Sequence, residues 1–103
     1  MPNRLLKAQS SLLGAYTKAG AHIEDFNTTE RYNSMQKLAA IRTRLAQEGR
    51  SLPNHQLSSL ESAVSSFSSK AGRLHIKATN DVQGVKDSFE NLANVLSQIE
   101  QSL

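Results

Sequence analysis

The side chains best suited to chemistry are three histidines and nine carboxylates in a chain of 103 residues. His22, His55 and His75 lack the H-x-x-x-H spacing of a helical metal site, and no carboxylate pair accompanies them. The chain has no cysteine, which excludes disulfides and thiolate chemistry. It also has no glycine-rich phosphate loop, G-x-S-x-G elbow or dinucleotide fingerprint. We therefore expect a protein that is not an enzyme, with no catalytic residues, no cofactor, no metal and no small-molecule ligand.

The basic residues are the other group that could recognise a ligand. The chain carries 12 Lys and Arg against 9 Asp and Glu, a net charge of +3, while residues 81–103 alone sum to −3. Six basic residues mark a possible partner anchor or basic patch: Lys37, Arg42, Arg44, Lys70, Arg73 and Lys77. Such a patch could bind the phosphates of nucleic acid. Only 5% of the residues are aromatic, which leaves little for base stacking and favours pairing with the acidic last segment.

Arg42 stands out because it falls close to the middle of the apolar stripe of its segment. Burying an unpaired charge costs several kcal/mol, so this side chain must be paired or must lie at a boundary. One interpretation makes Arg42 a partner-binding anchor, since arginine is favoured in interface cores. In the other interpretation, the apolar stripe is centred nearer Ile41. Arg42 then lies at the edge of the stripe, and its aliphatic stem covers apolar surface. The second interpretation is favoured.

The firmest structural signal is a turn at residues 49–53. Gly49 suits the position just after a helix end, and Pro53 cannot continue a helix from the preceding turn. Either Ser51 or Asn54 could cap the next helix. Weaker breaks near residues 27 and 80 divide each half again, which predicts one domain over 1–103 with helices near 3–25, 28–48, 54–78 and 81–102.

The apolar spacing predicts an all-α fold, and two architectures satisfy it. The first is a small antiparallel bundle of about four helices. In the second, each half is one continuous helix and the resulting long hairpin self-associates. In both, the last segment presents a seam with alternating three- and four-residue spacing that we expect to bind a partner helix: Val82, Val85, Phe89, Leu92, Leu96 and Ile99.

The third segment repeats this spacing and also carries a run of serines. Seven of the twelve residues 58–69 are serine, so this helix needs tertiary contacts to form. Its small, nearly uncharged outer face would suit a protein interface or an ordinary solvated surface. The second is slightly favoured.

The length and the central turn resemble those of the WXG100 helical hairpins and of small helical subunits or chaperones of bacterial secretion systems. The WXG100 motif itself is absent, because the turn reads Gly49-Arg50-Ser51-Leu52-Pro53 and the chain has no tryptophan. The composition, rich in serine, asparagine and glutamine, favours a bacterial or phage origin.

These observations predict a non-catalytic protein–protein interaction module, such as an assembly subunit, adaptor or small chaperone. Protein partners or self-association are expected, because so short a chain with few large apolar residues buries a marginal core. The alternatives are a basic helical nucleic-acid-binding protein and a small inhibitor or immunity protein. With no apolar run long enough to cross a bilayer and no signal peptide, we expect no membrane insertion and a cytoplasmic location, although export without a signal remains open.

Overall fold

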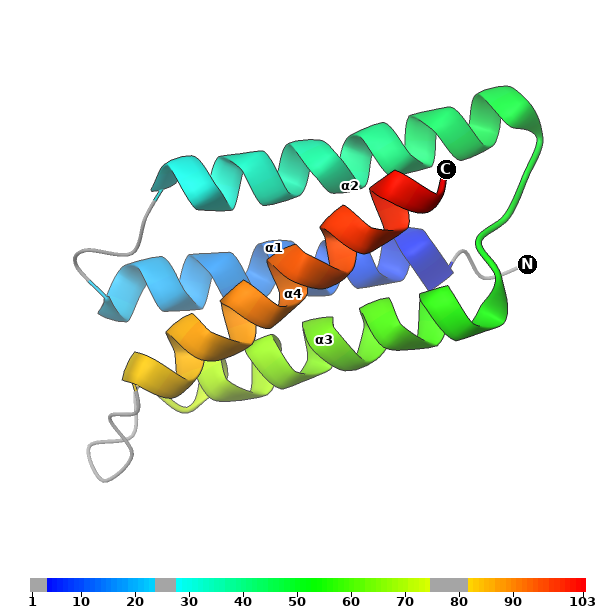
Figure 1. Ribbon diagram of the computed structural model, residues 1–103. Helices are drawn as coiled ribbons and strands as arrows, with labels where there is room; N and C mark the ends of the chain where they lie inside the picture. The colour runs from blue at the N-terminus through cyan, green and yellow to red at the C-terminus, as the bar shows by residue number, and fades with distance from the viewer. Residues whose placement is uncertain (1–3, 24–27, 75–81) are drawn as a thin grey trace.

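Four helices account for nearly all of the chain that the structure describes. The structure is a computed structural model, and it describes residues 4–23, 28–74 and 82–103. The helices are α1 (Arg4–His22), α2 (Thr28–Glu48), α3 (Asn54–Gly72) and α4 (Val82–Ser102), and the described residues contain no strand. The all-α prediction is confirmed. Of its two architectures, the four-helix bundle is the one observed (Figure 1).

Helices that follow one another in the sequence run in opposite directions (Figure 1). The closest packing is between α1 and α3 and between α3 and α4, while α2 rests more lightly on α4 and α1. In chain order the helices form two antiparallel pairs, α1–α2 and α3–α4. Residues 49–53 join them at one end of the bundle, where α2 ends and both α1 and α3 begin (Figure 1).

The turn after α2 forms as the sequence predicts. Gly49 has a φ of +63°, the left-handed conformation that only glycine adopts readily. The Arg50 N–H donates to the carbonyl of Leu45, and the Gly49 N–H donates to the carbonyl of Ala46. These two bonds make a Schellman motif, which satisfies carbonyls that the helix end would otherwise leave without partners.

The start of α3 differs from the prediction. Pro53 occupies the N-cap position and no side chain caps the helix, so neither Ser51 nor Asn54 has that role. The Pro53 carbonyl accepts the first helical bond, from the N–H of Leu57, at 3.0 Å. Proline is suited to this place because its fixed φ and missing N–H cost nothing at a helix start.

Helix α3 also ends earlier than predicted, at Gly72 rather than near residue 78. After it, the N–H groups of Arg73 and Leu74 donate to carbonyls three residues back, which tightens the last turn. The apolar spacing continues through Leu74, beyond the last residue of the regular helix. The predicted breaks near residues 27 and 80 lie outside the described residues.

Three aromatic rings from three helices meet at the centre of the bundle. Tyr16 of α1, Phe67 of α3 and Phe89 of α4 have ring centroids 5.5–5.6 Å apart, in edge-to-face or tilted pairs. Such pairs contribute beyond the area they bury. Alanines surround them on α1 and α3, where small side chains allow the two helices to approach closely: Ala8, Ala15, Ala19, Ala63 and Ala71.

Helix α2 adds no aromatic ring to this core and approaches it partly through polar groups. Its buried side chains are Ser34, Leu38, Ile41 and Leu45. The Arg31 guanidinium lies 6.0 Å from the Tyr16 ring centroid and donates to the Tyr16 carbonyl at 3.4 Å. Burial raises the pKa of Tyr16 to about 12, against the opposing effects of the Ser34 hydroxyl and the Arg31 charge.

Candidate partner-binding groove

The seam predicted on the last helix packs inside the chain. Five of its residues are buried in the core, and Val82 is half-buried against it. The five are Val85, Phe89, Leu92, Leu96 and Ile99. In this bundle the seam therefore holds α4 to its neighbours. Its use by a partner stays a prediction, one that would require another helix to move away first.

Of the six predicted basic residues the structure describes five, and it does not bring these five together. On α2, Lys37 donates to the Ser97 hydroxyl of α4 at 2.7 Å, whereas Arg42 donates to the side-chain carbonyl of Gln9 on α1. Arg44 is exposed and donates to the Leu103 carbonyl at 2.6 Å. Lys70 and Arg73 lie at the far end of α3, and Lys77 lies outside the described residues. The first three point to different neighbours instead of forming one patch.

Arg42 borders a groove at the end of the bundle that carries the 49–53 turn. The groove has a volume of about 670 Å³, and its walls come from the start of α1, the second half of α2, the turn and the start of α3. It is lined by Arg4, Leu5, Ala39, Arg42, Thr43, Leu45, Ala46, Arg50, Ser51, Leu52 and Leu57. It forms where lightly packed α2 diverges from α1 and α3.

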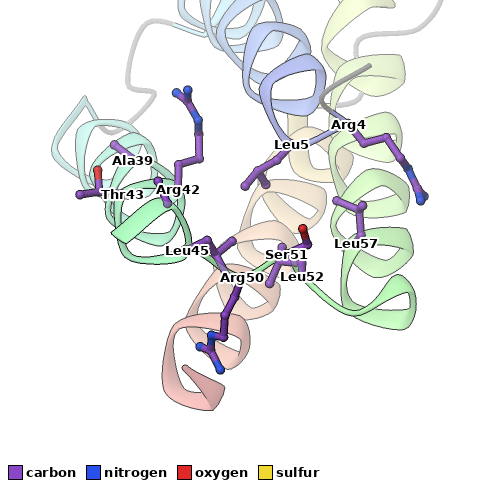
Figure 2. Close-up of a pocket in the computed structure, with 11 residues that line it drawn as sticks. Arg4, Leu5, Ala39, Arg42, Thr43, Leu45, Arg50, Ser51, Leu52 and Leu57 are labelled. Carbon is purple, nitrogen blue, oxygen red and sulfur yellow. The ribbon is translucent and has the colours of Figure 1, made fainter. Parts of the chain in front are cut away.

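Leucines from three helices and the turn form the floor of the groove. Figure 2 shows Leu5, Leu45, Leu52 and Leu57 directed toward its middle. Leu45 and Leu52 are buried in the main core, while Leu5 and Leu57 pack against it and remain half-buried. The floor therefore combines two buried core leucines with two that remain partly open to solvent.

Three arginines surround this floor, at separate places around its edge (Figure 2). Two of them form ion pairs with acids that do not line the groove: Arg4 with Glu61 of α3, and Arg50 with Glu48 at 2.8 Å. The paired charges raise the pKa of Arg4 and lower that of Glu61, chiefly through their shared hydrogen bonds. Among the residues that the structure describes, no Asp or Glu lines the groove itself.

Arg42 differs from the other two because its partner is neutral. It is half-buried and donates to the side-chain oxygen of Gln9, and it has no carboxylate partner among the residues that the structure describes. It lies at the edge of the α2 stripe, beside buried Ile41. The Arg42 charge thus lies beside apolar surface, and the Gln9 amide is its only polar contact among the described residues.

Two further leucines of α1 are exposed to solvent. Leu6 and Leu13 are 44% and 56% exposed, unusually open for leucine. They lie three residues before and four residues after Gln9, which puts them on the side of the helix that contacts Arg42. Neither leucine is among the residues that line the groove, so they are apolar surface of α1 outside it.

The groove offers groups suited to non-covalent contacts. Its lining has guanidinium groups, two hydroxyls and aliphatic side chains, and the described lining residues include neither a general base nor an activated nucleophile. In the described part of the chain, no group of three or more His, Asp or Glu could hold a metal ion. The groove therefore presents positive charge beside apolar side chains.

Sequence reasoning named Arg42 and missed most of the groove. Arg4 and Leu5 come from the first turn of α1, and Leu52 and Leu57 come some fifty residues later. The even apolar spacing of α3 gave no sign that Leu57 would be more open than Leu60. One usable signal is the breadth of the apolar stripe on α1, where Leu6 and Leu13 flank the row of Leu5, Leu12 and Ala19. So broad a face can extend beyond its closest neighbour.

Fold and site together define a four-helix bundle with an arginine-rimmed apolar groove at one end. Comparison with protein-family models, with curated proteins and with solved structures gives no match for this chain. None of the described helices is long and apolar enough to cross a membrane. The functional argument therefore depends on the geometry of the groove.

Proposed function

We propose that this protein is a non-catalytic protein–protein interaction module, an adaptor, assembly subunit or small chaperone, that binds its partner at the groove. The observation that carries the proposal is the leucine floor of the groove, in which Leu5 and Leu57 remain half-buried and open to contact. Covering apolar surface contributes roughly 25 cal/mol per Å², so a partner that covers these leucines gains affinity from them. The α4 seam is the less accessible of the two surfaces, because its residues already pack against the other helices of the bundle. The groove is therefore favoured over the seam.

The distribution of basic residues favours a protein partner over nucleic acid. Binding to a phosphate backbone needs several cations along one track, and affinity grows with their number. Here Lys37 and Arg44 are engaged with α4 and the C-terminal residue, while Lys70 lies near the opposite end of the bundle. The groove adds an apolar floor, which a phosphate backbone would not cover.

Site-specific photo-crosslinking in the native source tests this function. A photoreactive amino acid replaces Thr43, an exposed residue of the groove, and in a matched control it replaces Ser62, exposed on the outer face of α3. We expect a discrete adduct from the Thr43 position that protease digests and nuclease leaves intact.

Two results would overturn the proposal. If no adduct is specific to Thr43, the groove is not where a partner binds. If nuclease removes the adduct, the nucleic-acid alternative replaces the interaction module.

A further inference from the structure

We infer that the partner of the groove is an acidic amphipathic helix, with leucine-like side chains on one face and carboxylates on either side of them. This inference rests on the proposed function, because it names the chemistry of the partner at the same site. It follows from three properties of the groove: its charge, the placement of that charge, and the secondary structure of its walls.

The charge of the groove selects carboxylates. Its lining carries three arginines and no acidic residue. Within this chain Arg4 and Arg50 each already hold a carboxylate, those of Glu61 and Glu48. A guanidinium group can donate hydrogen bonds to several oxygen partners, because it has five N–H donors. An incoming acid can therefore join these pairs, and at Arg42 it would supply a carboxylate where the described partner is a neutral amide.

The placement of the arginines fixes the pattern of the partner. They stand at separate places around the leucine floor and not in one cluster (Figure 2). A partner whose acids were gathered at one end would meet one arginine and bring no carboxylate to the other two. A helix with carboxylates flanking an apolar stripe places charge on both sides of the floor at once.

The walls favour a helix over an extended strand. Helices surround the groove on three sides, and their backbone groups are bonded within each helix, so no sheet edge is available for strand addition. The remaining mode is an apolar helical face laid into a groove, with anchors at i, i+3 or i+4 and i+7. The half-buried Leu5 and Leu57 of the groove offer such a face apolar surface to cover.

A peptide-display selection on the full-length protein tests the inference. The probe is a library of peptides of about 14 residues, four helical turns, with a constant alanine-rich helical frame and randomised surface positions. We expect the enriched peptides to share leucine-type residues on one face, with Asp or Glu on both sides of it. Replacing those acids with the corresponding amides should lower the affinity roughly tenfold, and added salt should weaken the binding of the acidic form.

Two pairs of variants place the binding at the groove. Arg42→Gln should lower the affinity for a selected peptide about tenfold, whereas Lys18→Gln, which removes the same charge from an exposed site on α1, should leave it unchanged. Ala46→Glu puts an acid into the groove and should also weaken binding, unlike Ser62→Glu on the outer face of α3. Ala46 is exposed, so this second pair stays informative even if Arg42→Gln perturbs the fold.

The outcomes separate this inference from the proposed function. Enriched peptides that are neutral or basic, or peptides insensitive to both Arg42→Gln and Ala46→Glu, overturn the acidic helix. A selection that enriches no peptide does the same. If the Thr43 adduct still forms in any of these cases, the protein remains an interaction module with a different kind of partner. If a labelled single-stranded oligonucleotide binds with the same dependence on Arg42, both conclusions fail.

Discussion

Helices α1, α3 and α4 share an aromatic core, whereas α2 is attached by a smaller apolar contact together with polar side chains. The first three bring the rings of Tyr16, Phe67 and Phe89 together at the centre of the bundle. Helix α2 reaches its neighbours through Lys37 to α4 and through arginines to α1. Apolar contact draws helices close, while long charged side chains bridge a wider separation. The groove lies where that separation is left open.

This difference explains why a chain with a well-formed core still exposes leucines. A stripe as broad as that of α1 can satisfy two neighbours. On one side α3 packs closely against it, and on the other α2 leaves part of it uncovered. Leu6 and Leu13 are the visible result. The exposed leucines of α1 thus result from the modest packing of α2 against that helix.

The largest effect is expected from a charge placed in the three-helix core. Leu92 is fully buried on α4, so Leu92→Glu should cost more than about 4 kcal/mol and abolish the folded state. Leu13→Glu, at a half-exposed position, should keep the helix content and the thermal midpoint, as followed by circular dichroism. Retention of helicity and cooperative melting in Leu92→Glu would show that α4 is not part of the core.

A matched pair of alanine substitutions compares the two regions directly. Leu92 on α4 and Leu38 on α2 are both 0% exposed. We expect a loss of about 4 kcal/mol for Leu92→Ala and about 2 kcal/mol for Leu38→Ala, because α2 can shift to fill the cavity more easily. Urea denaturation measures both. Equal losses would mean that α2 is held as rigidly as the other three helices.

The buried tyrosine predicts a pH dependence at the boundary between the two regions. The pKa of Tyr16 rises from 10.0 to about 12 on folding, so the folded state holds this proton more tightly. Its contribution is complete below pH 10 and is lost as the pH rises toward 12. Between about pH 9 and 11, the free energy of unfolding should fall by roughly 1 kcal/mol more in the wild type than in Tyr16→Phe.

Tyr32→Phe is the matched control, because Tyr32 is 64% exposed on α2. It should keep the alkaline loss in full. If Tyr16→Phe loses stability as steeply as Tyr32→Phe, alkaline unfolding has another origin, and the interior beside Ser34 is wetter than the structure indicates.

The smallest effect concerns two glycines of α1. A methyl group at Gly14 would meet nothing within 4 Å, so Gly14→Ala should stabilise the protein by about 0.5–1 kcal/mol through helix propensity. At Gly20 it would lie 2.9 Å from an Arg31 nitrogen, so that side chain must shift. Gly20→Ala should therefore gain less. Equal gains in thermal denaturation would show that Arg31 does not hold α2 against α1.

The sequence predicted much of the fold because its strongest signals are local. The three- and four-residue spacing of α4 identified Val85, Phe89, Leu92, Leu96 and Ile99, all of which are buried. Gly49 marked its turn because a left-handed φ is a property of that one residue. The end of α3 was harder to predict, because the apolar spacing continues past Gly72 to Leu74 and gives no sign that the helix ends there.

The sequence by itself determined four amphipathic helices, the turn at residues 49–53 and which side chains are apolar enough to form a core. The tertiary structure decided that the α4 seam faces inward and that Arg4, Arg42 and Arg50 surround one groove. The physical reason is range: helical periodicity acts over three or four residues, whereas the groove joins residues some fifty positions apart. How far α2 stands from α1 depends on the packing of all four helices together, and that distance created the site.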